Sequence, residues 1–506
     1  MAQRKQKREN QPELDLGRSS KLRKGDLDIC WFNEIPIEIT SLILQFARHN
    51  NTMGSNILSF SFEVSTSDQD KLISHIVCRF VCRQWRDLLP PPAYYEQRCF
   101  AHFVAGKGWL NLLKWAREKG CGWDYLTCAH AADGGHLEVL KWAREKGCPW
   151  NSSTCARAAD GGHLEVLKWA RLNGCVWYSD TCDRAAEKGH FTVLKWARDN
   201  GCDWGASTCV AAAGAGHLEI LKWMKDKRCS WDSFSCSQAA IGGHLEVLKW
   251  LRENGCPWDA ETCTSAARNG HLEILKWARE NHCPWSAQTF AAAANTGRTE
   301  VLKWLQDNGC PWDASGYTQA AEGGHLAVLK WLRDNGCPWD ATTSEVAAST
   351  GNLEMLKWLK QNGCPWYDLV CFVRAAARGH LVVLKWMREN GCTWNEGACA
   401  AAADGGHLEV LKWLRENGCP WDAETCTSAA RNGHLEILKW ARENHCPWNE
   451  WCCSAATEKG HVKVLKWLRA QGCPWDHHTW VAAKRRRNKD LFKWVEENGC
   501  PKHEYK

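Results

Sequence analysis

The chain has 506 residues, of which 44% are hydrophobic, and a net charge of +6 from 64 basic and 58 acidic residues. This length exceeds what a single hydrophobic core organises, so several domains or a repeat array are expected, and the nearly balanced charge excludes an overall nucleic-acid or membrane signature. The 34 Trp and 30 Cys are far above average, and such bias indicates internal repetition.

Residues 1–28 are polar and basic, and we expect them to be a disordered tail. The segment has no apolar signal-peptide core, and the chain has no run of about 18 apolar residues, so we expect neither secretion nor a membrane span. Many cysteines without a secretion signal favour reduced thiols, and therefore the cytoplasm. The basic clusters at 4–8 and 21–24 resemble a bipartite nuclear-localisation signal, which adds the nucleus as a second compartment, with a solvated tail as the alternative.

Residues 29–92 predict two helices, at 33–47 and 73–89, from apolar residues at helical spacing. Ile35-Pro36, Glu38-Ile39 and the string VCRQWR at 81–86 resemble an F-box, although the linker at 48–72 is longer than this motif usually carries. F-boxes dock on the small adaptor of cullin-RING ubiquitin ligases. The resemblance implies an adaptor-binding surface made of Ile35, Pro36, Ile39, Leu42, Ile43, Val77, Val81, Cys82 and Trp85. The alternative is a helical cap that covers the first repeat.

The string Leu-Lys-Trp defines a repeat array over residues 93–501, followed by a short tail at 502–506. The step between its tryptophans is 27 residues, except between Trp358 and Trp386, where it is 28. We expect a local bulge or a change of superhelical direction near residues 372–379. A Cys follows six residues after each of these tryptophans, and a second Trp follows at eight in all copies but the last. About fifteen repeats result.

The copy at 259–285 shows how one unit folds. Asp259 can cap a first helix, and Asn269-Gly270 ends it. A second helix begins near His271, with an apolar face that includes Leu275 and Trp277. Helices of about ten residues are too short to be stable alone, so the units must stack into one continuous core. Residues 242–285 and 405–448 are identical, which indicates recent internal duplication.

The core string AARNGHLEILKW, at 266–277, resembles the second half of the ankyrin repeat, with Gly-His-Leu-Glu in most copies. The resemblance covers roughly 100–500 and implies an all-α, ankyrin-like solenoid of helix pairs. The unit is six residues shorter than the 33-residue ankyrin repeat, and Cys-Pro-Trp-Asp is too short for the β-hairpin finger of that family. Recognition through such fingers is therefore not expected.

The repeated Cys, His and Trp residues favour structure over chemistry. The C-x6-C spacing, as at Cys148 and Cys155, does not fit zinc, and Phe290 replaces the second Cys in one copy, so we interpret these thiols as buried core. We expect the histidines to hydrogen-bond at helix starts and the tryptophans to pack between helices rather than to stack on bases. No metal, cofactor or small-molecule substrate is expected, and no catalytic motif occurs.

Lysines and arginines recur on the outer face, which leaves a polyanion-binding stripe open as an alternative to a solvated face. Glutamates neutralise many copies, so we expect nucleic acid to be an improbable partner. The preferred hypothesis is a non-enzymatic protein-interaction module, acting as a substrate receptor of a ubiquitin ligase. The runner-up is a scaffold without a ubiquitin link.

We expect specificity where the repeats differ, after the second Trp and on the exposed side of the first helix. The partner-binding candidates are Tyr125, Leu126, His130, Arg157, Asp183, Arg184, Phe234, Gln238, Gln319, Glu345, Phe372 and Arg374.

Overall fold

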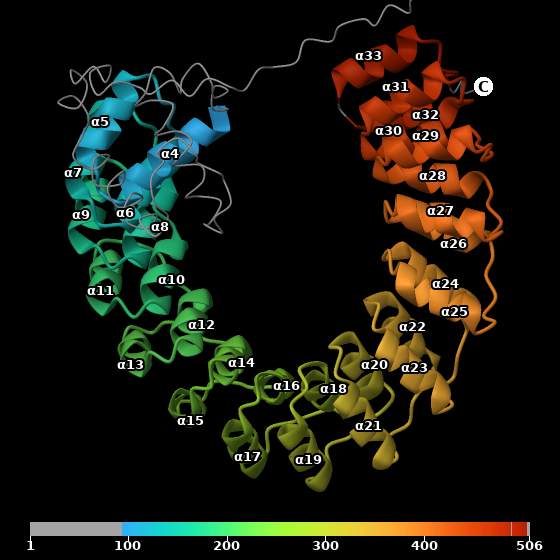
Figure 1. Ribbon diagram of the computed structural model, residues 1–506. Coiled ribbons are helices and arrows are strands. Elements are labelled where there is room, and N and C mark those ends of the chain that lie inside the picture. The colour runs from blue at the N-terminus through green and yellow to red at the C-terminus, as the bar shows by residue number, and fades with distance from the viewer. Residues whose placement is uncertain (1–93, 487, 503–506) are drawn as a thin grey trace, which may run out of the picture. The chain divides into compact units, whose positions relative to one another are not determined.

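The computed structural model describes residues 94–486 and 488–502, and this part of the chain consists of thirty helices without a strand. The predicted F-box-like segment and the basic N-terminal tail lie outside the described residues. The helices alternate between a first and a second helix of fifteen repeats, which confirms the all-α, ankyrin-like solenoid (Figure 1). None of the described helices combines the length and apolar character needed to cross a membrane.

The first helices are α4 (Tyr94–Gly106), α6 (Tyr125–Asp133), α8 (Ser152–Asp160), α10 (Ser179–Glu187), α12 (Ala206–Gly214), α14 (Ser233–Gly242), α16 (Ala260–Asn269), α18 (Ala287–Asn295), α20 (Ser315–Glu322), α22 (Ala341–Thr350), α24 (Asp368–Ala377), α26 (Glu396–Asp404), α28 (Ala423–Asn432), α30 (Trp451–Lys459) and α32 (His477–Arg485). The second helices are α5 (Leu110–Glu118), α7 (Leu137–Glu145), α9 (Leu164–Leu172), α11 (Phe191–Asp199), α13 (Leu218–Asp226), α15 (Leu245–Glu253), α17 (Leu272–Glu280), α19 (Thr299–Asp307), α21 (Leu326–Asp334), α23 (Leu353–Gln361), α25 (Leu381–Glu389), α27 (Leu408–Glu416), α29 (Leu435–Glu443), α31 (Val462–Ala470) and α33 (Lys489–Glu497).

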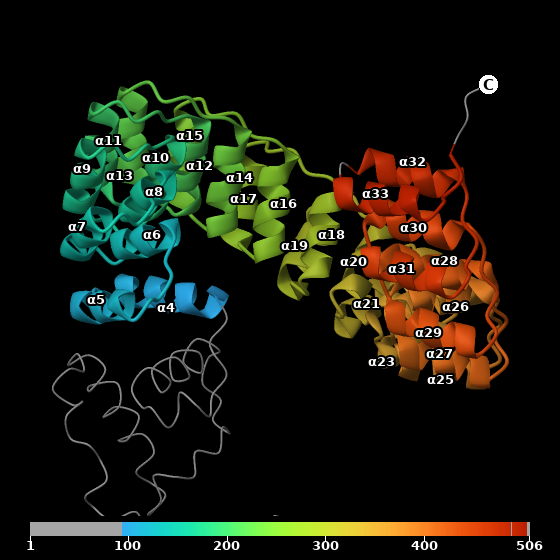
Figure 2. The same ribbon diagram turned by 90° about the horizontal axis from the view of Figure 1, so that it is seen from above.

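The described chain divides into two compact units. The first comprises residues 94–185 and 190–203, and the second comprises 186–189, 204–486 and 488–502. Figure 2 shows the helix pairs following one another along each unit. The sequence repeat continues through the boundary between the units and does not predict it.

Capping side chains and glycines fix both ends of the first helix. In α16 the Asp259 carboxylate accepts a hydrogen bond of 3.0 Å from the backbone N–H of Glu261, which satisfies one of the free donors of the first turn. Gly270 ends the helix in the left-handed region at φ 82°, where glycine pays no steric penalty. The chain then reverses at once, because the next helix begins at Leu272.

Small side chains allow the first helices of neighbouring repeats to pack closely within each unit. Cys263, Ala266 and Ala267 of α16 are fully buried, and α16 packs against both α14 and α18. The second helices pack chiefly on the first helix of their own repeat, through residues such as Leu275. Along α12–α23 of the second unit, the first helices line the inner side of the row and the second helices the outer side (Figure 1).

A histidine links successive repeats. The Nε2 of His163 lies 2.9 Å from the backbone oxygen of Asp133, thirty residues earlier, and the same bond recurs at His190, His271 and His434. A carbonyl oxygen only accepts, so Nε2 carries the proton in each of these bonds. Gly135 is required beside this ring, since a Cβ there would lie 2.6 Å from the imidazole. The predicted structural role of the histidines is therefore confirmed.

Arg228 shows what a side chain costs at the positive-φ position of the turn after the second helix. It adopts φ 58° where Gly255 of the next repeat adopts φ 78°, and a side chain in this region costs about 1 kcal/mol. A Cβ at Gly255 would meet no atom within 4 Å, so the cost at this position arises from the backbone alone. We expect Arg228→Gly to stabilise the chain by about 1 kcal/mol in urea unfolding. The matched reverse change, Gly255→Arg, should destabilise by a similar amount. Equal stability of all three proteins would contradict this explanation.

Candidate functional site

The repeats differ in the three residues that follow the second Trp of each turn, which we call the edge triplet. The triplet contains the capping residue and the start of the first helix, as in Asp259, Ala260 and Glu261. Most triplets are polar, but several carry large apolar side chains that remain exposed. In the first unit these are Tyr125 and Tyr178, and in the second unit they are Phe234, Tyr367, Leu369 and Trp451.

The exposure of these side chains is considerable. Tyr178 is 64% exposed, Phe234 63% and Trp451 48%. Aromatic side chains bury large areas in interfaces, so these exposed rings are candidate contacts for a partner. The edge triplets therefore form a candidate interaction surface within each unit.

The predicted partner-binding residues differ in their exposure to solvent and fall into three groups. Those that are exposed are Tyr125, Arg157, Arg184, Phe234 and Arg374. Those that are half-buried are Leu126, His130, Asp183, Gln238, Gln319 and Glu345. Phe372 is fully buried.

The prediction for Phe372 is wrong. Its ring is 0% exposed and packs edge-on against Trp394 at 5.4 Å, in the place that Cys263 takes in its own repeat. The expectation of a bulge near 372–379 is also wrong, because α24 is continuous through Ala377, while the alternative, a change of superhelical direction, stays a prediction. The extra residue is instead Tyr367, which is exposed in the turn before the helix. Counting back from His380 places it there, so the sequence did contain the signal.

The insertion at Tyr367 places a carboxylate, that of Asp368, in the first turn of α24. Asp368 accepts hydrogen bonds of 2.7 Å from Trp366 Nε1 and 3.2 Å from the backbone N–H of Thr393. The Nζ of Lys360 lies 3.2 Å from the Cys392 Sγ of the following repeat. Although burial alone would raise it, the pKa of Asp368 is lowered, because Cys392, Thr393 and Trp366 donate hydrogen bonds to the carboxylate and Lys360 lies nearby.

Two of the predicted residues take part in ion pairs between first helices. Arg157 lies 3.7 Å from the Asp133 carboxylate of the preceding repeat, and Arg184 lies 3.9 Å from that of Asp160. These pairs are partly exposed and contribute little stability, which leaves the charges accessible to a partner.

His130 stacks on His102 with centroids 5.7 Å apart. Burial, together with the nearby His102 and Arg157, lowers the pKa of His130.

The outer-face cations are used within the fold. The guanidinium of Arg279 lies 3.8 Å from the ring centroid of Trp285 and donates to the carbonyl of Cys283 at 2.8 Å. Lys276 pairs with Glu273 at 2.8 Å, one turn earlier. Trp258 packs edge-on against Trp277 at 5.6 Å, so the tryptophans fill the space between helices, as predicted. These contacts weaken the case for a polyanion-binding stripe.

The cysteines identified in the described residues, from Cys121 to Cys500, are buried, and none of them forms a disulfide. Cys209 and Cys229 approach each other with Sγ atoms 3.3 Å apart, and Cys256 donates to the carbonyl of Asp232 at 3.3 Å. The interpretation of these residues as buried core is confirmed, since Phe290 and Tyr317 occupy the same place and are equally buried.

One group of three side chains in the described part of the chain could hold a metal ion: Asp476, His477 and His478. Reasoning from the sequence concentrated on the repeated Cys and His positions and missed this group. The signal was nevertheless present, as two adjacent histidines directly after a capping aspartate in one edge triplet.

Three stretches of the chain, residues 236–279, 317–360 and 398–442, match the family model described as "Ankyrin repeats (many copies)". No curated protein matches the chain. Among solved structures, the chain resembles the pentatricopeptide repeat protein PPR10 from maize, with 14% identity and a TM-score of 0.29 over 92% of this chain and 87% of that one. It also resembles PPR10 in complex with an 18-nt psaJ RNA element, with 13% identity and a TM-score of 0.33 over 86% and 83%.

The thiols of the core make stability depend on pH. Burial raises the pKa of Cys310 to about 12 and that of Cys364 to about 11. Because the folded-state pKa lies above that of the unfolded thiol, this contribution to stability is complete below the unfolded pKa. It is lost as the pH rises from there towards the folded value.

We therefore expect the free energy of unfolding to fall between about pH 8 and about pH 10. One pKa unit corresponds to about 1.4 kcal/mol, so Cys310→Val should reduce this loss by roughly 1 kcal/mol. Urea unfolding of both proteins at the two pH values measures the difference. An identical pH dependence of the two proteins would exclude Cys310 as a source.

Proposed function

We propose that this chain is a non-enzymatic binding scaffold that recognises other proteins through its edge triplets and the exposed side of its first helices. The observation that carries the proposal is the difference in burial between the repeated and the variable positions of each repeat. The Leu of Leu-Lys-Trp and the Cys six residues after its Trp are buried in the described copies that carry them, whereas exposed aromatic side chains appear at the variable triplets, as at Phe234 and Trp451. Protein interfaces are enriched in aromatic residues and arginine, and such residues dominate their binding energy.

The match to ankyrin repeats supports the same proposal, since stacked repeats offer extended surfaces for partners. The cysteines identified in the described part of the chain are buried, and burial also raises the pKa of thiols such as Cys310, which makes them poor nucleophiles. Binding, rather than catalysis, is the use that remains for its exposed surface.

We further propose that the scaffold delivers its partners to a cullin-RING ubiquitin ligase through residues 29–92. The support is the F-box-like string from Val81 to Arg86 and the Ile35-Pro36 pair. A scaffold without this link is the alternative. Cytoplasmic or nuclear residence is part of the proposal, and the many buried free thiols are consistent with it.

The decisive experiment is affinity purification of the full chain followed by mass spectrometry of the bound proteins. Phe234→Glu and Trp451→Glu introduce the residue that Glu261 and Glu424 supply at the same place in other repeats, so the fold should be preserved. Val382→Glu is the matched control, because Val382 is exposed on a second helix where other copies carry Glu, as at Glu273.

We expect the two triplet variants to lose partners at least ten-fold, since a central aromatic in an interface contributes more than about 1.4 kcal/mol. The control should keep them. Deleting residues 30–90 should remove a cullin and its adaptor while other partners remain. If all three point variants bind equally, the edge triplets are not the recognition surface. A steep fall of binding with salt would instead favour a polyanion.

A further inference from the structure

The last repeat of the array carries an edge triplet unlike the others in the described chain. After Trp475 the residues are Asp476, His477 and His478, whereas the two preceding repeats have Asn-Glu-Trp at 449–451 and Asp-Ala-Glu at 422–424. One imidazole nitrogen from each histidine and one oxygen of Asp476 all lie within 4.8 Å of one another. His478 is exposed and the other two are half-buried, so an ion can reach all three.

We propose that Asp476, His477 and His478 form a binding site for a divalent transition-metal ion of the zinc type. Imidazole nitrogen combined with a carboxylate oxygen suits Zn²⁺, Co²⁺, Ni²⁺ and Cu²⁺. Calcium and magnesium ions prefer sites made of oxygen atoms alone. Three protein ligands leave at least one coordination position for water or for a group from another molecule.

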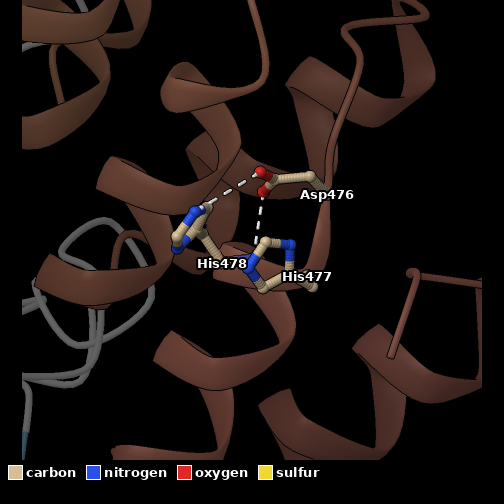
Figure 3. Close-up of side chains that lie close together, drawn as sticks. All are labelled: Asp476, His477 and His478. Atoms are coloured by element: carbon tan, nitrogen blue, oxygen red, sulfur yellow. Dashed lines mark hydrogen bonds and ion pairs between the residues drawn. The ribbon is translucent and has the colours of Figure 1, made fainter. Parts of the chain in front are cut away.

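The neighbouring residues hold the three side chains in place. One carboxylate oxygen of Asp476 caps α32 by accepting from the backbone N–H of His478 at 3.0 Å, and the other lies 3.9 Å from His478 Nε2 (Figure 3). The His478 ring stacks on Trp451 of the preceding repeat, with centroids 5.0 Å apart, and is tilted relative to the His477 ring, with centroids 4.0 Å apart. Both imidazoles therefore gather beside a carboxylate whose position is already fixed.

The ligand atoms of the three side chains need to move only a short way towards one another to bind an ion. Zinc–nitrogen and zinc–oxygen bonds of about 2.0–2.2 Å place tetrahedral ligand atoms roughly 3.3 Å apart. The three ligand atoms lie within 4.8 Å of one another. Side-chain rotations that move each ligand atom by about 1 Å are therefore sufficient to bring all three to zinc-binding distance. The N-terminus of α32 disfavours a cation, because it is the positive end of the helix dipole. The Asp476 carboxylate offsets this effect, which makes it necessary to the site.

Zinc binding to the full chain tests the proposal, using isothermal titration with ZnCl₂ in a buffer that does not chelate metals. The double variant His477→Ser/His478→Ser places there the residues that follow the capping Asn151 in α8, so α32 should still form. Asp476→Asn should retain the cap, as Asn151 does, while removing the charged ligand. His445→Gly is the control, because it removes an exposed histidine at a turn position where most other copies have glycine.

We expect the parent and His445→Gly to bind one more equivalent of Zn²⁺ than the double variant. Asp476→Asn should bind that equivalent at least ten-fold more weakly, with unchanged helix content by circular dichroism. Copper bound to the parent should show imidazole nitrogen couplings by electron paramagnetic resonance that the double variant lacks. Equal stoichiometry and affinity in the parent and the double variant, or no zinc binding by the parent, would overturn the proposal. Neither result depends on whether the scaffold binds other proteins.

Discussion

Stacking between neighbouring repeats is the interaction on which the rest of this structure depends. From α5 onward the described helices have only eight to ten residues, and isolated helices become even marginally stable only at about 12–15 residues. A repeat therefore persists because its first helix lies between the first helices of its neighbours, as α16 does between α14 and α18. The His163–Asp133 hydrogen bond is one of the links that fix the register of this stacking.

This dependence divides the residues of each repeat into two classes. The positions that touch a neighbour must stay small or keep their shape, which explains the buried alanines and the glycine beside each linking histidine. The place of Cys263 is the informative exception, because Phe290, Tyr317 and Phe372 all occupy it and are buried. Their rings pack against the tryptophans of the next turn, as Phe290 does on Trp312 at 5.1 Å, so one site tolerates two sizes of side chain. The edge triplets meet no such requirement and are able to vary for recognition.

Much of this arrangement could be read from the sequence. The 27-residue period, the capping aspartates and the glycine pairs predict fifteen helix pairs, and the structure contains them. The exposure of Tyr125 and Phe234 was also predictable, because both follow a capping Asp. Phe372 was misplaced because one inserted residue shifts the register when positions are counted forward from Trp366. Counting back from His380 instead aligns Phe372 with the buried Cys263. The Asp476 cluster was overlooked because it belongs to one copy rather than to the repeat.

The charges of the outer face show why composition alone misleads about partners. A row of arginines suggests a basic stripe, but Arg279 and its equivalents lie on tryptophan rings and bind turn carbonyls, as Arg117 and Arg442 do. These arginines therefore stabilise the turn between helices through contacts that occupy part of their charge. The accessible variation begins directly after these turns, in the edge triplets where the first helices begin.

The most direct test of the account is the removal of one full period. Deleting residues 244–270 joins Gly243 to His271 and restores the Gly-His junction that the intact chain has between Gly270 and His271. Far-ultraviolet circular dichroism during urea unfolding should show a folded protein with a cooperative transition, whereas deletion of 244–256, about half a period, should not. If the full-period deletion unfolds as readily as the half-period one, the neighbour contacts are not interchangeable and stacking is not the basis of the fold.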